Sequence, residues 1–357
     1  MKTIKPLIGL ISMGLICIHS SSIAYAESDL PKGQLLCHSY SSYTAMDSKI
    51  HYYDLNTGEI FNITSSVFVN EMNADFGSHP YDIVFMAIDP AADEWDIYRY
   101  NTISRRFTNL TRNSGYRNED PKFSPDGRSI LFKRGYWSQE ADRFIYDLAE
   151  MDLLTGEIRM LTDDVQEQAM PVYSPDGESV YYSVHLETGE SGIYRISCTD
   201  PAFSQECLFH ESGLSAYYPM TAGDDLYFTR WISADLPNDS IVKYTDGQLQ
   251  ALPFNNEAFN CSDPFPLADG TMFYSSTKNG SYDLYYYNRD ASVELTPLST
   301  GLNELGTSFY SRDEARTLIQ NTADFLVEKT PSERNMDANG DGSVNVFDLV
   351  YFKQLIS

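Results

Sequence analysis

Short apolar runs separated by tight turns dominate the chain from residue 33 onwards. The clearest example is the stretch 123–132, in which Ser-Pro-Asp-Gly separates two apolar segments. Proline presets φ, aspartate bonds to the neighbouring backbone and glycine accepts a positive φ, so this sequence predicts a tight turn between two antiparallel strands. The same pattern returns in the stretch 173–182.

Weaker versions of this turn make the pattern a repeat. They lie at 77–85, 220–229, 266–275 and 310–319. The six start positions, 77, 123, 173, 220, 266 and 310, are 44 to 50 residues apart. Strand-rich repeats with a period of about 40–50 residues are typical of β-propeller blades.

A second hairpin pattern indicates the number of blades. It occurs six times, at 53–64, 98–111, 151–162, 194–209, 242–253 and 285–299. Inner-strand candidates lie around Asp75, Pro121, Pro171, Pro219, Pro264 and Thr307, and the next strand has seven candidates because both 33–37 and 315–319 fit. We therefore predict an all-β fold, a six-bladed propeller over 33–312 in which residues 303–312 complete the blade begun at residue 33. Such closure removes an exposed sheet edge. A seventh, degenerate blade is the alternative.

The Ser-Pro-Asp-Gly repeats resemble those of six-bladed propellers of the TolB type. The resemblance covers about 33–312 and is clearest in the two repeats at 123 and 173. It implies blade geometry and no particular reaction. TolB carries an α/β domain before its propeller, for which residues 27–32 leave no room, so we do not expect a role in the Tol system.

The N-terminal residues have the pattern of a secretory signal peptide. Lys2 and Lys5 precede an apolar run over 7–18, and Ala24-Tyr-Ala26 forms a small-residue cleavage site, which assigns 1–26 to the signal. The mature chain is then expected outside the cell or in the periplasm. No later segment approaches the ~20 apolar residues of a membrane span, so none is predicted.

The formal net charge of −26 narrows the choice of partners. Nucleic acids and anionic membranes attract basic patches, so neither is expected to bind this chain. An excess of carboxylates suits a protein that binds Ca²⁺ or works outside the cell, although solubility alone explains it equally well.

Four cysteines remain after the signal: Cys37, Cys198, Cys207 and Cys261. An even count in an exported chain permits two disulfides, with three connectivities. We favour a Cys198–Cys207 bridge that closes a hairpin, which leaves Cys37 and Cys261 to join the first and last blades.

The most specific motif is the twelve-residue stretch 337–348 near the C-terminus. Oxygen-bearing side chains stand at loop positions 1, 3, 5, 9 and 12, namely Asp337, Asn339, Asp341, Asn345 and Asp348. Gly342 holds position 6, where such a loop turns sharply, and Ser343 would offer its backbone carbonyl at position 7. This spacing predicts a Ca²⁺ site, followed by a helix from Asp348 to about Ile356.

These residues resemble one repeat of a type I dockerin, an EF-hand-like module that docks extracellular enzymes onto cohesin-bearing scaffoldins. The resemblance covers 335–357 and implies that Asp337, Asn339, Asp341, Ser343, Asn345 and Asp348 hold Ca²⁺. It also implies that Val346, Phe347 and Lys353 face the cohesin. Dockerins normally have two repeats, and we find one. Residues 313–334 are expected to end the propeller domain and form a linker.

The sequence does not identify a catalytic centre. It contains no Gly-x-Ser-x-Gly elbow, so the peptidase that often accompanies such propellers is not expected. Carboxylates that enter the inner strands are Glu119, Asp120, Glu167 and Asp263, and aromatic residues near inter-strand loops that suit sugar stacking are Tyr136, Trp137, Tyr217, Tyr218 and Trp231.

Two functional hypotheses follow from these patterns. The first is a binding or interaction module, tethered to an extracellular, cellulosome-like assembly through the calcium-dependent tail. The alternative is a carbohydrate-active enzyme, a glycoside hydrolase or polysaccharide lyase, with its site in the propeller mouth and a polysaccharide as substrate.

Overall fold

The computed structural model describes residues 30–64, 67–200, 202, 204–232, 239–326, 336–338 and 342–354. The expected signal peptide, 1–26, lies outside these residues. Within them, no helix has both the length and the apolar character that a membrane crossing requires.

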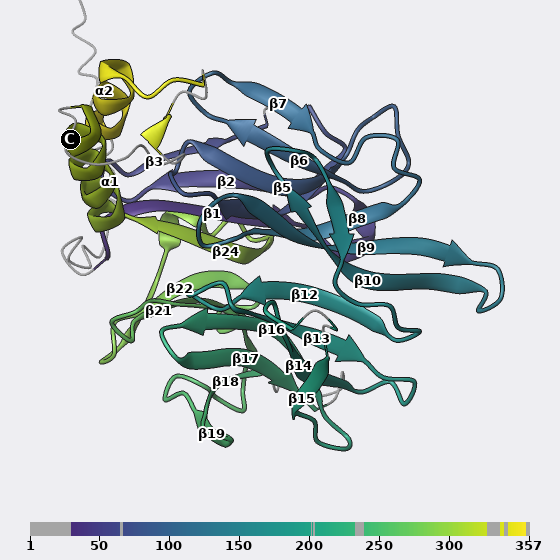
Figure 1. Ribbon diagram of the computed structural model, residues 1–357. Helices are drawn as coiled ribbons and strands as arrows, with labels where there is room; N and C mark the ends of the chain where they lie inside the picture. Colours follow the sequence, from purple (N-terminus) through teal and green to yellow (C-terminus); the bar gives the residue numbers. More distant parts are fainter. Residues whose placement is uncertain are drawn as a thin grey trace, which may run out of the picture. The chain divides into compact units, whose positions relative to one another are not determined.

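The described strands form antiparallel sheets of four, as expected of propeller blades (Figure 1). The sets are β24 (Asn303–Ser311) with β1 (Gly33–Tyr40), β2 (Lys49–Asp54) and β3 (Glu59–Asn62); β4 (Asn70–Phe76), β5 (Asp82–Ile88), β6 (Asp96–Asn101) and β7 (Arg106–Asn109); β8 (Arg117–Phe123), β9 (Ser129–Ser138), β10 (Arg143–Asp152) and β11 (Ile158–Met160); β12 (Glu167–Tyr173), β13 (Ser179–His185), β14 (Ser191–Ser197) and β15 (Gln205–Phe209); β16 (Ser215–Ala222), β17 (Asp225–Trp231), β18 (Ser240–Thr245) and β19 (Gln248–Ala251); and β20 (Cys261–Pro266), β21 (Met272–Ser276), β22 (Asp283–Tyr287) and β23 (Ser292–Glu294). A single parallel pair, Ser191 with Ser215, links the sets of β12 and β16.

The first strand of each set is its inner strand. In chain order β4, β8, β12, β16, β20 and β24 each contact the next, and β24 contacts β4. Apolar side chains between neighbouring sheets form the core: Phe132 and Met86, for example, belong to one cluster between the β4 and β8 sheets. The predicted turns also occur, because Gly127 N and Gly177 N donate to the carbonyls of Ser124 and Ser174, both at 2.8–2.9 Å.

The two ends of the strand region share one sheet, as the sequence predicted. β24 pairs with β1 antiparallel, with Leu35 opposite Phe309. The seventh strand candidate, 315–319, is not a strand, because these residues lie in the helix α1 (Arg312–Leu326). The segment 313–334, expected to end the propeller domain and form a linker, begins with this helix, and residues 327–335 lie outside the described part.

Helix α1 begins directly after β24 and is fixed by a capping box. Glu314 N donates to Ser311 Oγ at 3.1 Å, and Ser311 N donates to Glu314 Oε2 at 2.7 Å, so each residue satisfies a free amide of the other. The helix buries Ala315 and Leu318 against the first sheets. It also packs beside α2 (Val346–Gln354), and the two helices lie at one edge of the molecule in Figure 1. Short 3₁₀ turns occur at Tyr43–Ala45 and Thr296–Leu298.

The structure contradicts the predicted disulfides, because all four cysteines are free thiols. In the β14–β15 hairpin Tyr194 is opposite Cys207, whereas Cys198 lies beyond the end of β14. The two thiols are therefore offset along the strands, although the residues between them form a hairpin. Cys37 and Cys261 are buried in different sheets, and burial raises the pKa of both thiols, that of Cys261 to about 12.

Candidate functional site

The described part of the C-terminal loop centres on Asp337, Gly342 and Asp348. Gly342 has a φ of 87°, a conformation that favours glycine, and its N–H donates to Asp337 Oδ2 at 2.8 Å. Asp348 is buried, and its two carboxyl oxygens accept from Ala338 N at 3.0 Å and Asn345 N at 2.7 Å. Asp337 is thus bonded to loop position 6 and Asp348 to positions 2 and 9. Their carboxylate oxygens are of the kind that a hard cation such as Ca²⁺ prefers.

Two of the expected ligands, Asn339 and Asp341, lie outside the described residues. Ser343 and Asn345 follow the turn as expected, and Asn345 Nδ2 donates to the carbonyl of Ser343 at 3.3 Å. Among the described residues, no group of three or more His, Cys, Asp or Glu side chains stands where it could hold a metal.

Helix α2 has one buried side and one exposed side. Asn345 is its N-cap, since its side-chain oxygen accepts from Phe347 N at 2.9 Å. The predicted partner residues Val346 and Phe347 are 59% and 67% exposed, and Val350, one turn further on, is 50% exposed. Lys353 is exposed as well. These four side chains lie on the exposed side of α2.

The buried side of α2 rests on the β4–β5 region, which the sequence did not indicate. Phe352 is fully buried and its ring meets the His79 ring edge-on, with centroids 6.1 Å apart. Tyr81 Oη donates to the carbonyl of Tyr351 at 2.5 Å. Ala338, from the loop, belongs to the same core cluster as Phe352. The tail is thus packed onto the strand region and is not a free extension.

Every inner strand carries a β-bulge with a left-handed residue at the same place. These residues are Asn73, Asp120, Met170, Tyr218 and Asp263, with φ of 52–55°, and Gly306, with φ of 65°. The register of each inner strand shifts at this point. Left-handed φ is strained for Met and Tyr, and bulges of this kind re-aim side chains, often beside functional sites.

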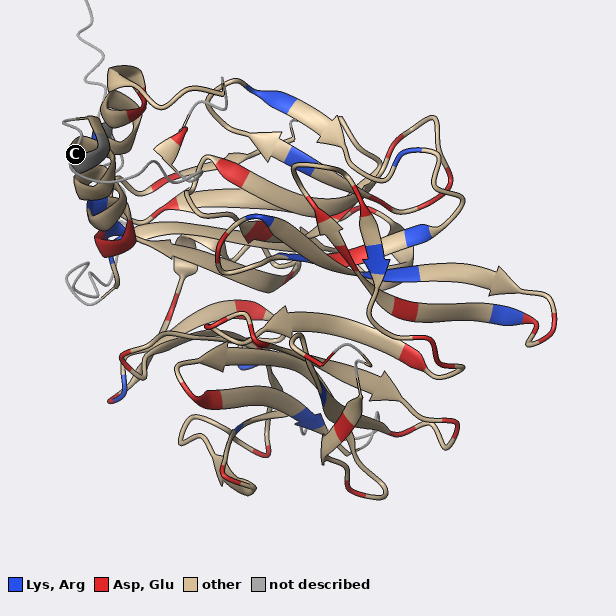
Figure 2. Cartoon of the chain, in the orientation of Figure 1, with Lys and Arg blue, Asp and Glu red and all other residues tan. Residues whose placement is uncertain are grey.

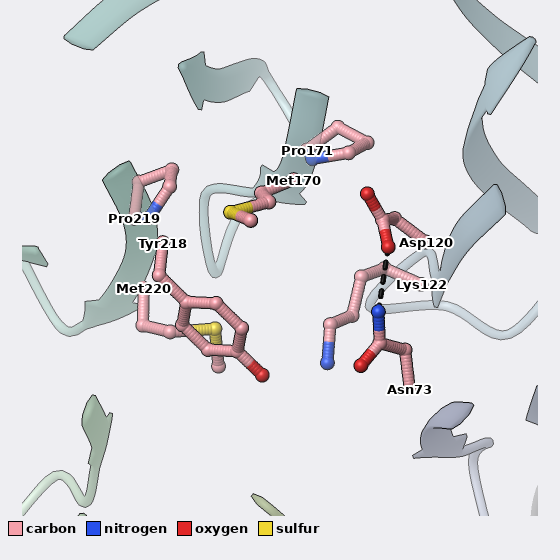
Figure 3. Close-up of a pocket in the computed structure, with 8 residues that line it drawn as sticks. All are labelled: Asn73, Asp120, Lys122, Met170, Pro171, Tyr218, Pro219 and Met220. Carbon is pink, nitrogen blue, oxygen red and sulfur yellow. Dashed lines mark hydrogen bonds between the residues drawn. The ribbon is translucent and has the colours of Figure 1, made fainter. Parts of the chain in front are cut away.

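Four of these residues line a small central cavity (Figure 3). Asn73 Nδ2 donates to Asp120 Oδ1 at 2.6 Å, and the figure shows the Lys122 ammonium and the Tyr218 hydroxyl pointing toward the same space. Lys122 Nζ lies 3.3 Å from Asp75 Oδ1. The cavity offers a volume of ≈ 20 Å³ to water, which suffices for about one or two molecules. It is too small for a sugar or a peptide.

Asp263, one of the predicted carboxylates, is buried beside this cavity. Ser262 Oγ donates to its Oδ1 at 2.9 Å, and Gly306 N donates to its Oδ2 at 3.2 Å. Burial raises the pKa of Asp263 to about 6, although both hydrogen bonds act to lower it. The hydrogen-bond partners of Asp263 come from β20 and β24, whereas the other predicted carboxylates belong to β8 (Glu119 and Asp120) and β12 (Glu167).

Glu119 and Glu167 converge on a single lysine. Lys133 Nζ lies 3.3 Å from Glu119 Oε2 and 2.7 Å from Glu167 Oε1, and 4.0 Å from the centre of the Tyr146 ring. Burial acts to lower the pKa of Lys133, but the adjacent carboxylates raise it above its usual range. The ammonium stays charged and contacts both glutamates, so the cluster is an ion-pair network centred on Lys133.

The structure separates the aromatic residues that suited sugar stacking. Tyr136 and Trp137 are exposed but follow one another in β9, so they occupy opposite faces of the sheet. Tyr217 is tied to Asp239, whose Oδ2 accepts its hydroxyl at 3.1 Å, and Tyr218 lines the central cavity. Trp231 ends β17 and is half-buried. They do not form a single platform.

Comparison with known proteins supports the fold. No protein-family model matches the chain. The structure is similar to hydrazine synthase of Kuenenia stuttgartiensis, with a TM-score of 0.67 and 14% identity over 79% of this chain and 47% of the other. It is also similar to TolB from Acinetobacter baumannii, with a TM-score of 0.60 and 16% identity over 78% of this chain and 66% of TolB. The chain has a TolB-like, propeller-type β fold.

Two curated proteins share sequence with part of the chain. An uncharacterized peptidase, YuxL of Bacillus subtilis, is 40% identical over 75 residues, which are 21% of this chain and 11% of YuxL. Dipeptidyl-peptidase 5 of Porphyromonas gingivalis is 28% identical over 168 residues, which are 46% of this chain and 23% of the peptidase. The chain thus spans less than a quarter of either relative.

Proposed function

We propose that this protein is an exported, closed six-bladed propeller that acts as a binding or interaction module, tethered to an extracellular assembly through its C-terminal calcium loop and α2. The proposal rests on the difference in exposure between the two sides of α2. Phe352 and Asp348 are buried, whereas Val346, Phe347 and Val350 are exposed together. A cluster of exposed apolar side chains is a usual feature of protein-binding surfaces.

The expected partner is a cohesin domain of a scaffoldin, and the expected cofactor is Ca²⁺, held by 337–348. When bound, Ca²⁺ would supply the positive charge that gathers the loop carboxylates and would thereby fix the start of α2. Asp337 and Asp348 already brace this loop through backbone amides, and Phe347 then presents its ring outward. The small central cavity, with room for water alone, agrees with a module that binds through its surface.

The test is calorimetric titration of the full chain with a type I cohesin domain, in Ca²⁺ and in EDTA. Binding is expected in Ca²⁺ alone, and Phe347→Ala should weaken it at least tenfold, since exposed aromatic anchors dominate such interfaces. Leu154→Ala is a matched control, because Leu154 is 77% exposed in the turn between β10 and β11. Equal binding in EDTA, or binding indifferent to Phe347→Ala, would refute the proposal.

The second candidate function is a carbohydrate-active enzyme, favoured by Glu119 and Glu167. Their contacts with Lys133 Nζ, at 3.3 and 2.7 Å, place the two carboxylate oxygens no more than 6.0 Å apart. Glycosidases separate their two carboxyl groups by about 5–9.5 Å. Burial raises the pKa of Glu119, as a general acid requires. Polysaccharide breakdown that Glu119→Gln abolishes would support this candidate, and no breakdown would exclude it for the substrates tested.

A further inference from the structure

A groove on the β9–β10 hairpin carries side chains that the proposed function does not use. β9 and β10 are ten residues each and run past their neighbours β8 and β11, as Figure 1 shows. The groove has a volume of ≈ 630 Å³ and is lined by Tyr116, Arg134, Tyr136, Asp147, Met160 and Asp163, among others. Cavities that hold small ligands measure about 300–1,000 Å³.

Arg134 lies in this groove without an acidic partner. Its guanidinium stacks 4.0 Å from the centre of the Tyr116 ring, and no carboxylate of the described residues lies within ion-pair distance of it. Asp147 is its cross-strand neighbour, but Oδ1 of that residue accepts from Thr162 Oγ1 at 3.1 Å and from Asp164 N at 3.0 Å. Arg134 is thus held flat with its N–H donors available.

Two tyrosine rings frame this cation. Tyr116 and Tyr136 are 38% and 41% exposed, and their rings meet edge to face with centroids 6.4 Å apart. A ligand in the groove therefore meets an apolar ring face from Tyr136 and hydrogen-bond donors from Arg134. The exposed carboxyl group of Asp163 supplies acceptors at the same site.

We propose that this groove binds a neutral oligosaccharide. A ligand there needs a flat apolar face for Tyr136, acceptors for Arg134 and donors for Asp163, and a pyranose ring has all three. An anionic ligand would face Asp147 and Asp163 on a chain whose net charge is −26, and Figure 2 shows Asp and Glu in many of its strands and loops. A cationic ligand would face Arg134. The proposal is independent of the C-terminal tail.

The test is titration of the full chain with cellohexaose, xylohexaose and mannohexaose, with an oligogalacturonate as the anionic comparison. At least one neutral hexasaccharide should bind, and Tyr136→Ala should weaken it at least tenfold. Trp137→Ala is the matched control, because Trp137 is exposed on the opposite face of the same strand, and it should leave binding within twofold.

The variant Arg134→Gln distinguishes a neutral ligand from an anionic one. Glutamine keeps a hydrogen-bond donor and removes the charge, so a neutral sugar should lose less than tenfold in affinity. Absence of binding to all three neutral sugars, binding of the oligogalacturonate alone, or equal loss in Tyr136→Ala and Trp137→Ala would each overturn the proposal. Circular dichroism spectra of the variants show whether they remain folded.

Discussion

Removal of the Phe352 ring should weaken calcium binding, although Phe352 is not a ligand. The side chain is fully buried against the strand region, and replacement of a buried Phe by Ala costs about 3–5 kcal/mol. Alanine favours helices, so the loss cannot come from helix propensity. If the loop is ordered only while α2 is packed down, the measured Ca²⁺ affinity is the intrinsic affinity multiplied by the packed fraction.

The size of the effect follows from this relation. A loss of about 3 kcal/mol lowers the ratio of packed to unpacked tails by about a hundredfold. If the tail packs with about 2 kcal/mol, the ratio falls from about 30 to about 0.2, and the packed fraction falls from nearly one to about one sixth. The dissociation constant for Ca²⁺ should then rise about sixfold. Tyr81→Phe, which removes one hydrogen bond worth about 0.5–1.5 kcal/mol, should act in the same direction and more weakly.

Calorimetric titration of the full chain with CaCl₂ measures this coupling. Val350→Ala is the control, since Val350 lies on the exposed side of the same helix. A dissociation constant that stays within twofold of the wild-type value in Phe352→Ala would show that the loop orders by itself. A wild-type chain that binds no Ca²⁺ would instead refute the ligand assignment, which is a separate failure.

Three further predictions concern the strand region. Gly306→Ala should lower the free energy of unfolding by about 2 kcal/mol or more, measured by urea denaturation, because the left-handed φ is strained and the new Cβ would overlap the His38 ring; an unchanged midpoint would contradict this. Asp263 has a pKa of about 6 in the fold against 3.8 normally, so the fold binds the extra proton and wild-type stability falls as the pH rises from about 4 to about 6. Asp263→Asn has no carboxyl group to titrate, so its free energy of unfolding does not fall in this way. The free energy of unfolding of the variant minus that of the wild type should therefore rise by about 3 kcal/mol between about pH 4 and about pH 6. A difference that does not change with pH would argue against the buried carboxyl. Iodoacetamide should label exposed Cys207 in the native protein and buried Cys37 and Cys261 only after unfolding, as read by mass spectrometry, whereas a Cys198–Cys207 bridge would leave Cys207 unlabelled.

The turns and hairpins were predictable because their chemistry is local. Ser-Pro-Asp-Gly specifies its own turn, and a fixed period then gives the sheets. Helix α1 was missed although Ser311 and Glu314 form a capping box that the sequence displays. The segment 315–319 fits a strand pattern, but the buried positions Ala315, Leu318 and Thr322 follow a helical spacing instead.

Other features depend on tertiary contacts that no short pattern encodes. The left-handed positions of the inner strands carry Asn, Asp, Met, Tyr and Gly, and their one shared signal is the proline that follows in four of them. The cysteine prediction failed because residue spacing does not give strand register. The calcium-loop prediction could be made from the sequence because all its expected ligands lie within twelve residues, whereas the surface beneath α2 comes from residues 79–81, far away in the sequence.

The junction between β24 and α1 has a mechanical consequence. Ser311 ends the strand and Arg312 begins the helix, with no loop between them to absorb motion. If the tail anchors the protein to a scaffold, tension from flow or a bound polymer passes along α1 into β24, the strand that clasps the two chain ends together. Under load the ring should open first between β24 and β1. The helices α1 and α2, packed together beside this sheet, would take up part of the load.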